Sequence, residues 1–388
     1  MEPSKGKPLK IIFYANTDWY LYNFRLPLAL ALKKQGHEIV CISPPGPYGQ
    51  RLETAGCRWI PLPMERRSLN PWTEARLLQH LLLLYRRERP ALTHHFTLKC
   101  VIYGAIAAWR VGGGIATVSA ITGLGHVFTS DTSRTRVLRP LLRKLLQFCM
   151  NRPHSRLILQ NRDDQQELLR YGLVNAENIR LVRGSGVNTQ RFQPRLSSRP
   201  PGPFRVLLAT RLLWEKGVGE YIAAARQLQT EGLRIQFNLA GVPDPGNPAS
   251  IPQKTIDEWQ QQGLIEALGH VENMESLLAS TDLMVLPSYR EGTPRSLLEA
   301  AACGLPIVTT DTIGCREVVE HERNGLLIPP RNSFALAEAI RQLYNDPEAC
   351  KRMGQAGRAK VLAEFDEQIV IDQTLAVYRE LLGHPILS

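Results

Sequence analysis

Residues 9–43 carry the pattern that decides the fold, and they read LKIIFYANTDWYLYNFRLPLALALKKQGHEIVCIS. The short apolar run Leu9–Ala15 predicts a strand, and the amphipathic stretch Phe24–Gln35 predicts a helix that stops at Gly36. The apolar run Ile39–Ser43 then predicts a second strand. A strand, a helix and a second strand in this order form a β-α-β unit, in which the two strands are parallel.

The second half of the chain repeats this alternation. Its strand-like runs are Phe204–Ala209, Ile235–Ala240, Leu283–Pro287 and Pro306–Thr310, and helical patterns such as Gly219–Leu228 and Ser296–Ala302 separate them. Such alternation predicts the α/β class, with two doubly wound, Rossmann-like parallel sheets that carry helices on both faces. In folds of this class ligands bind beyond the carboxyl ends of the strands.

The length of the chain, 388 residues, favours two domains at roughly 150 residues each. The segment Phe192–Pro203 contains four prolines and cannot continue a helix or a central strand, which predicts a linker at residues 193–203. We therefore expect one domain over residues 1–192 and a second over residues 204–366, facing each other across a cleft. Residues 367–388 begin with helical spacing, and they are predicted to form a terminal helix that packs back on the first domain.

Composition excludes several classes of protein. Apolar residues make up 44% of the chain and charged residues 21%, which is typical of globular domains rather than of disordered or collagen-like chains. The seven cysteines are scattered and form no Cys-x-x-Cys pair, which argues against a disulfide framework or a zinc site and favours the cytoplasm. The polar N-terminus lacks the apolar core of a signal peptide. The apolar stretch Val101–Gly125 is interrupted by Arg110 and by glycines at 112–114, so it predicts a buried helix followed by a strand, not a membrane span.

Charge divides the chain into unlike halves. Residues 1–200 hold 30 Lys and Arg against 12 Asp and Glu, whereas residues 201–388 hold 17 against 24. A basic half indicates an anionic partner. The stretch Arg134–Phe148 combines leucines at helical spacing with arginines, which is typical of helices on anionic lipid surfaces and also of a core helix with a solvated face. We expect peripheral docking on the inner face of a membrane, and no nucleic acid partner, because the basic residues are not interleaved with aromatic ones.

The segment Leu286–Ala300 reads LPSYREGTPRSLLEA and joins a predicted strand to a predicted helix. Free backbone N–H groups and the helix dipole suit the N-terminus of that helix to a phosphate. The residues at this N-terminus are Thr293, Pro294, Arg295 and Ser296. Glu291 and Glu299 flank the predicted anion site. Two glutamates at this spacing are weak evidence for a site by themselves, because surface glutamates are common. The strand, turn and helix around them strengthen the prediction of an anion site.

The segment Ala209–Gly217 reads ATRLLWEKG and follows another predicted strand. Its Arg211 and Lys216 provide a guanidinium and an ammonium group that suit a diphosphate and stabilise charge on a leaving group. Two anion-favouring loops after two strands of the same domain favour a nucleotide-diphosphate site over an ordinary basic loop.

These two segments resemble the G-R-L-x-x-x-K-G and E-x7-E elements of the retaining glycosyltransferases of family four, which have the two-domain GT-B architecture. Further segments that resemble family landmarks, in the family's order, are Lys34–Val40, Leu159–Asp164, Gly184–Asn188, Gly269–Val271, Asp282–Ser288 and Asn324–Pro329. The resemblance covers nearly the whole chain. The sequences ITGLG after residue 120 and PRSLLE after residue 293 are similar to the branch that builds lipid-linked oligosaccharides and surface polysaccharides.

The resemblance implies that a hexose or N-acetylhexosamine moves, with retention of configuration, from a nucleotide-diphosphate sugar to an acceptor hydroxyl. A UDP-sugar is the favoured donor, and a polyprenyl-diphosphate-linked glycan or a polysaccharide is the implied acceptor. Arg211 and Lys216 are then the diphosphate-binding pair, Glu299 holds the ribose, and Glu291 lies near the transferred sugar. Val271 is the implied backbone contact to the base. The chain has no Asp-x-Asp motif, so neither a metal nor a cofactor is expected, and the two cations supply the positive charge.

The predicted N-terminal domain departs from the commonest family pattern at two places. Where many members carry a Gly-Gly pair after the first strand, this chain has Asn16, and where many carry a histidine before a glycine, it has Thr122. The role of that histidine is therefore not carried over. The candidates for an acceptor-side or auxiliary role are Asn16, His94, His95 and His126, although a packing role is the commoner one for a single histidine.

Two other functions stay open from the sequence. An enzyme of the UDP-N-acetylglucosamine 2-epimerase type shares the architecture, and release of nucleotide diphosphate only in the presence of an acceptor distinguishes a transferase from it. A nucleic-acid-binding protein would use the basic half of the chain, and salt-sensitive retention on DNA without affinity for sugar nucleotides would identify it.

Overall fold

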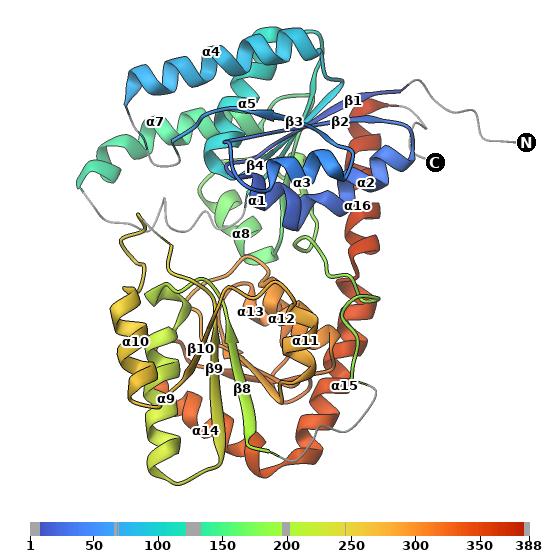
Figure 1. The fold of residues 1–388 in the computed structure, drawn as a ribbon. Helices are drawn as coiled ribbons and strands as arrows, with labels where there is room; N and C mark the ends of the chain where they lie inside the picture. The colour runs from blue at the N-terminus through green and yellow to red at the C-terminus, as the bar shows by residue number, and fades with distance from the viewer. Residues whose placement is uncertain are drawn as a thin grey trace, which may run out of the picture. The chain divides into compact units, whose positions relative to one another are not determined.

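The computed structural model describes residues 8–65, 68, 70–121, 133–195, 202–244 and 246–383, without the side chains of residues 133–139, 141 and 142. The chain forms two compact units, Met1–Ser185 with Val370–Ser388, and Gly186–Ile369. Both are α/β units on an open parallel sheet, as the sequence predicts (Figure 1). Part of the predicted linker, residues 196–201, lies outside the described residues.

The first unit is built on a seven-stranded parallel sheet with the strand order β3-β2-β1-β4-β5-β6-β7. Its strands are β1 (Lys10–Tyr14), β2 (Glu38–Ser43), β3 (Arg58–Pro61), β4 (Leu92–Phe96), β5 (Ala116–Ala120), β6 (Ser155–Leu159) and β7 (Ile179–Leu181). Strands β4 and β5 are buried at every residue, as expected inside a parallel sheet that is covered on both faces.

The helices of the first unit before its last strand are α1 (Asp18–Tyr20), α2 (Leu26–Lys34), α3 (Gly49–Thr54), α4 (Pro71–Glu88), α5 (Leu98–Val111), α7 (Ser133–Met150) and α8 (Arg162–Arg170). Helical structure begins earlier than the predicted start because the hydroxyl of Thr17 accepts the N–H of Tyr20 at 3.1 Å and caps α1. A π-helical turn, η1 (Leu21–Arg25), then joins α1 to α2. Among the described helices, none is both long enough and apolar enough to cross a membrane.

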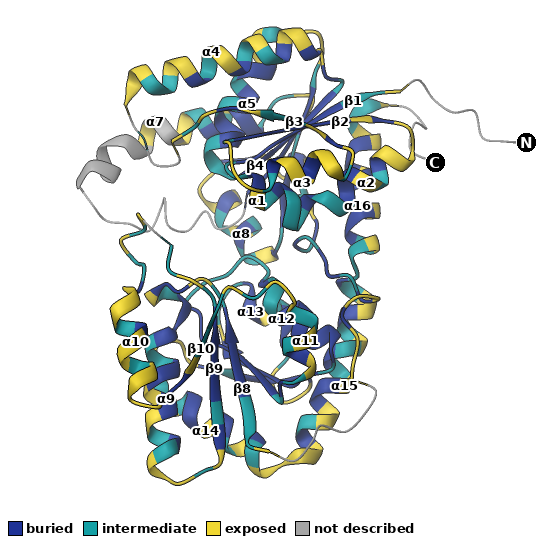
Figure 2. Ribbon diagram, in the orientation of Figure 1, coloured by how far each residue is buried: buried dark blue, intermediate teal, exposed yellow. Residues whose placement is uncertain are grey.

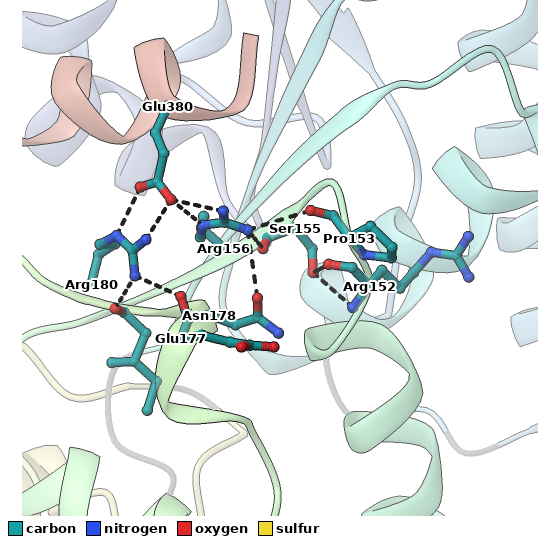
Figure 3. Close-up of polar contacts among 9 residues, drawn as sticks. Arg152, Pro153, Ser155, Arg156, Glu177, Asn178, Arg180 and Glu380 are labelled. Atoms are coloured by element: carbon teal, nitrogen blue, oxygen red, sulfur yellow. Dashed lines mark hydrogen bonds and ion pairs between the residues drawn. The ribbon is translucent and has the colours of Figure 1, made fainter. Parts of the chain in front are cut away.

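The last helix, α16 (Glu367–Leu382), begins at the residue that the sequence predicts, and most of it belongs to the first unit. Tyr378 is fully buried in the apolar cluster that also contains residues of β1. The Glu380 carboxylate accepts hydrogen bonds from Arg156 of β6 at 2.7 Å and from Arg180 of β7 at 2.8 Å (Figure 3). One end of the sheet is therefore tied to the C-terminal helix by charge as well as by apolar packing.

The second unit is built on a six-stranded parallel sheet with the strand order β10-β9-β8-β11-β12-β13. Its strands are β8 (Phe204–Ala209), β9 (Ile235–Ala240), β10 (Glu266–Gly269), β11 (Leu283–Leu286), β12 (Ile307–Thr310) and β13 (Leu326–Ile328). Its helices are α9 (Val218–Thr230), α10 (Gln253–Gln261), α11 (Met274–Ala279), α12 (Arg295–Ala302), α13 (Cys315–Val318), α14 (Ser333–Asn345) and α15 (Pro347–Glu364). Buried residues concentrate on the strands and on the inner faces of the helices (Figure 2).

The chain enters the second unit at Gly186, so residues 186–192 belong to that unit, whereas the sequence analysis assigned them to the first domain. The N–H of Val187 donates to the carbonyl oxygen of Phe365 at 2.9 Å, which ties the incoming segment to the end of α15. A Cβ at Gly186 would lie 2.6 Å from the Cα of Glu367, so only a residue without a side chain permits this close approach. Hydrogen bonding, rather than the proline-rich composition that follows, marks the start of the second unit.

Each sheet contains one point where the strand order reverses: between β1 and β4 in the first unit, and between β8 and β11 in the second. The loops that follow the two central strands diverge to opposite faces there, and doubly wound folds bind their ligands at this point. In the second unit these loops carry Lys216 and Glu291.

Candidate functional site

In the second unit the loops after β8 and β11 pack closely against each other and share a hydrogen bond. Gly217 follows a short 3₁₀ turn, η3 (Trp214–Lys216), and has a left-handed backbone with φ of 73°. A Cβ at Gly217 would collide with the carbonyl oxygen of Pro287. The N–H of Tyr289 donates to the carbonyl oxygen of Glu215 at 3.0 Å. The position of the Lys216 backbone therefore depends on a glycine at 217 and on the neighbouring loop.

Lys216 and Glu291 meet across this pair of loops. The Lys216 Nζ lies 2.6 Å from the Glu291 Oε1, and the two side chains are only 11% and 15% exposed. A charge-assisted hydrogen bond in so little solvent is stronger than a surface ion pair. The ammonium group has three donors, so this pair leaves donors that an anionic ligand can take.

A third loop, after β12, supports the backbone at Glu291. The N–H of Glu291 donates to the carbonyl oxygen of Ile313 at 3.1 Å. Gly314 has φ of 83°, and a Cβ there would collide with the carbonyl oxygen of Gly292. The sequence analysis missed Gly314, although a glycine in the loop after a predicted strand at the same edge of the sheet is the signal that could have identified it.

The N-terminus of α12 lies beside Glu291. Pro294 is buried at the N-cap position, and the Oγ1 of Thr293 is buried without a hydrogen-bond partner. An unsatisfied buried hydroxyl is costly, which makes Thr293 a ready ligand for a polar group at this helix end. Ser296, in the first turn of α12, is half-buried.

Glu299 lies one turn further along α12 and is 9% exposed. Burial raises the pKa of this carboxyl, while the Arg295 guanidinium acts in the opposite direction. The Nε of Arg295 donates to the Glu299 Oε1 at 2.9 Å within the same helix. The structure thus brings together two of the predicted donor-site residues and leaves further acceptor lone pairs on the carboxylate.

Arg211 and Val271 belong to neither of these two pairs. Arg211 follows β8 with a half-exposed side chain, and its Nη1 is 3.4 Å from the Oδ2 of Asp244 in the loop after β9. The sequence analysis did not identify Asp244, whose signal was again a glycine- and proline-rich loop directly after a strand. Val271 follows β10, at the end of the sheet, and is half-buried.

The acceptor-side candidates lie in the first unit. Asn16 follows β1 at the point where the strand order reverses and is half-buried. His94 and His95 are fully buried in β4, with His94 Nδ1 2.6 Å from the Tyr378 hydroxyl and His95 Nε2 3.0 Å from the Tyr85 hydroxyl.

Burial lowers the pKa of both histidines: that of His95 falls to about 3, and that of His94, which also feels the charge of Arg25, lies well below its usual range. Burial therefore favours the neutral form of both rings. His126 lies outside the described residues.

In the described ranges, no three or more His, Cys, Asp or Glu side chains gather as they would to hold a metal ion. The seven cysteines are all free thiols. Burial raises the pKa of Cys315 in the second unit, so this thiol near the β12 loop is a packing residue in the structure.

The two open sheets, each with one reversal of strand order, define a two-domain, Rossmann-like architecture of the GT-B class. Solved structures share it. Anabaena HepE in complex with UDP and glucose matches with a TM-score of 0.77 and 20% identity, over 95% of this chain and 99% of that one. Sucrose-phosphate synthase from Thermosynechococcus elongatus matches with a TM-score of 0.77 and 20% identity, over 96% and 99% of the two chains.

Sequence comparison then identifies the family. Residues 24–184 match the glycosyl transferase 4-like domain, and residues 189–360 match the glycosyl transferases group 1. The chain is 27% identical, over 96% of its length and 99% of the relative, to the N,N'-diacetylbacillosaminyl-diphospho-undecaprenol alpha-1,3-N-acetylgalactosaminyltransferase of Campylobacter jejuni. It is 22% identical, over 90% and 92%, to the capsular polysaccharide biosynthesis glycosyltransferase CapM of Staphylococcus aureus. The chain therefore belongs to the family-four glycosyltransferases, which confirms the resemblance, and it is a glycosyltransferase with the GT-B fold.

Proposed function

We propose that this glycosyltransferase moves a hexose or N-acetylhexosamine, with retention of configuration, from a nucleotide-diphosphate sugar to a hydroxyl of a lipid-linked or polysaccharide acceptor. The observation that carries the proposal is the Lys216 and Glu291 pair, 2.6 Å apart where the strand order of the second sheet reverses. A UDP-sugar is the proposed donor. This choice is supported by the likeness to HepE, whose structures hold UDP and glucose or UDP-glucose.

The main catalytic effect in this proposal is stabilisation of the leaving diphosphate. Lys216 donates one N–H to an oxygen of the diphosphate while another of its N–H groups remains hydrogen-bonded to Glu291, and Arg211 adds a second positive charge. In a site with little solvent, a preplaced ammonium group stabilises developing charge more than water does. The Thr293 hydroxyl and the N–H groups at the N-terminus of α12 extend the same anion site. With these positive groups supplied by the chain, we propose that transfer requires no metal ion.

The two carboxylates have different roles in the proposal. Glu291, held by Lys216, accepts hydrogen bonds from hydroxyl groups of the transferred sugar. Glu299, oriented by Arg295, accepts the two vicinal hydroxyls of the ribose, which suits the paired oxygens of a carboxylate. Val271 contacts the base through its backbone.

The proposed acceptor is a polyprenyl-diphosphate-linked glycan, presented at the inner face of a membrane by a cytoplasmic, peripherally bound enzyme. The name of the Campylobacter jejuni relative, which includes diphospho-undecaprenol, supports this class of acceptor. In α4 the side chains of Trp72 and Leu83 are exposed, and Arg86 and Arg87 occupy the last turn. Exposed aromatic and basic groups on one helix are typical of lipid-surface contacts. Asn16 is the proposed acceptor-side contact after β1.

A thermal-shift panel of UDP, GDP, ADP and their common sugar conjugates tests the donor site directly. Saturable stabilisation by the uridine nucleotides supports the proposal, since a ligand that binds the folded state raises its melting temperature. If no nucleotide or sugar conjugate of the panel raises the melting temperature, the proposed donor site is contradicted. Release of UDP from a stabilising UDP-sugar only after an acceptor glycan is added then assigns transfer rather than epimerisation.

A further inference from the structure

The loop after β9 is held in a fixed register against the loop after β8, which carries Arg211. Strands β8 and β9 are parallel neighbours in the sheet of the second unit (Figure 1). Beyond the strands the two chain segments stay together, because the N–H of Ile251 donates to the carbonyl oxygen of Leu212 at 2.9 Å. A Cβ at Gly241 would collide with the carbonyl oxygen of Thr210, so the two backbones approach as closely as a glycine permits. The loop after β9 therefore has a defined position beside the backbone of Arg211.

Asp244 lies in this loop, and the loop itself restrains its carboxylate. The N–H of Asp244 donates to the Ser250 Oγ at 2.9 Å, and the N–H of Asn247 donates to the Asp244 carbonyl oxygen at 3.0 Å. The Nδ2 of Asn247 also donates to the Asp244 Oδ2 at 3.2 Å. The carboxylate is thus fixed at its backbone and at one oxygen, and its side chain is only 19% exposed.

The same carboxylate oxygen holds Arg211. The Arg211 Nη1 donates to the Asp244 Oδ2 at 3.4 Å, and among the residues that the structure describes Asp244 provides the one carboxylate within ion-pair distance of this guanidinium. The Arg211 side chain is 54% exposed, so the pair adds little to the stability of the fold. Its consequence is orientation, because a long side chain that is already held in one direction loses less freedom when it binds a ligand. The guanidinium has five N–H donors, so the pair leaves others for a phosphate.

The two cations proposed for the donor site are held alike. Lys216 pairs with Glu291 from the loop after β11, and Arg211 pairs with Asp244 from the loop after β9. We propose that Asp244 is a positioning residue of the donor site, whose carboxylate orients the Arg211 guanidinium towards the diphosphate of the sugar nucleotide. In this proposal Asp244 touches no phosphate and acts through Arg211. The proposal rests on the proposed function, which assigns the diphosphate to Arg211.

A double-mutant cycle on the full-length protein tests whether Asp244 acts through Arg211. The variants are Asp244→Ala, Arg211→Met and the two combined, and calorimetry measures the Kd of the nucleoside diphosphate that stabilises the unmodified protein, which we expect to be UDP. With Arg211 present, Asp244→Ala should weaken binding about 3- to 10-fold, because the freed arginine must then be ordered when the ligand binds. With Arg211→Met in place, the same change should no longer weaken binding. A merely structural role of Asp244 in its loop would weaken binding equally in both cases.

Glu231→Ala is the matched control. The Glu231 Oε1 lies 2.7 Å from the Arg341 Nη2 in the same unit, and the two side chains are 34% and 26% exposed. Glu231 follows the C-terminal end of α9, whereas Arg211 lies in the loop that precedes this helix. Glu231→Ala should bind the nucleotide as tightly as the unmodified protein. Asp244→Ser, which keeps a polar side chain in the loop but removes the carboxylate, replaces Asp244→Ala in the cycle if the alanine variant does not fold.

Unchanged or tighter binding by the Asp244 variant overturns the proposal, and so does an equal weakening with and without Arg211. If Arg211→Met binds the nucleotide as tightly as the unmodified protein, Arg211 is not a ligand of the diphosphate and the positioning role of Asp244 falls with it. Failure of the proposed function has a separate sign, because no nucleotide would then bind the unmodified protein, and that result overturns both proposals together.

Discussion

Replacing Lys216 by alanine is the sharpest perturbation of the proposed mechanism. The change removes an ammonium group that lies 2.6 Å from the Glu291 Oε1 and is 11% exposed. Loss of one preorganised donor to a developing oxyanion costs about 10²- to 10³-fold in kcat, and we expect a loss of that size. Because the mostly buried Glu291 carboxylate loses its ion-pair partner, the free energy of unfolding should fall by about 1–3 kcal/mol. Initial rates at saturating donor and urea denaturation measure the two effects separately.

A matched control comes from Lys360, whose Nζ lies 2.7 Å from the Glu320 Oε1 with the lysine side chain 13% exposed, in the same unit but outside the candidate site. Lys360→Ala should lose comparable stability and keep its turnover within about threefold. Lys216→Arg, which keeps the charge, should recover part of the rate. The reasoning is refuted if Lys216→Ala retains a kcat within about threefold of the unmodified enzyme, or if Lys360→Ala loses as much.

Three further predictions concern Gly217 between the two loops, Glu299 as the proposed ribose-binding carboxylate, and stability in acid. Gly217→Ala places a Cβ against the neighbouring loop at positive φ and should lower the free energy of unfolding, measured by urea denaturation, by about 2–3 kcal/mol. Gly232 also has a positive φ but has open space around it, so Gly232→Ala should lower the free energy of unfolding by only about 1 kcal/mol. Equal losses for the two variants would contradict the close approach at Gly217. Glu299→Gln should weaken UDP binding about 10- to 100-fold by calorimetry, and an unchanged Kd would exclude the ribose role. Burial would raise the pKa of Glu88, but hydrogen bonds from the surrounding lysine and arginines lower it to about 2. A pKa that is lower in the folded state adds stability that is present above pH ~4.5 and is lost as the pH falls towards 2. Glu88→Gln should therefore lower the free energy of unfolding by about 2–3 kcal/mol at pH 7 and by little at pH 2. A loss of stability that does not change with pH would disprove the lowered pKa of Glu88.

The strands that the sequence locates best are interior strands of the second sheet. The predicted and observed bounds agree for β8 (Phe204–Ala209) and β9 (Ile235–Ala240). An interior strand of a parallel sheet is a continuous apolar run, and this pattern is local. Strand β4 has no such pattern, because its sequence LTHHF includes two histidines, and the sequence analysis treated those histidines as candidate acceptor-side groups. Their tyrosine partners show why the strand tolerates them.

The residues of the candidate site also divide into those that a local sequence pattern predicts and those that it does not. Lys216, Glu291, Arg295 and Glu299 were predicted because each lies in a short motif after a strand, and the structure joins them as two pairs. Asp244 and Gly314 were missed because they act through neighbours on other loops.

The sequence by itself determined the α/β class, the two parallel sheets, the family and the segments that carry the proposed donor-site residues, because these depend on periodicity and on motifs of neighbouring residues. Only the tertiary structure decided where the second unit begins, which charges are paired, and that the loop after β9 holds Asp244 beside Arg211. Such contacts form between residues as distant as His94 and Tyr378, 284 positions apart, and burial there makes the loss of a partner energetically costly.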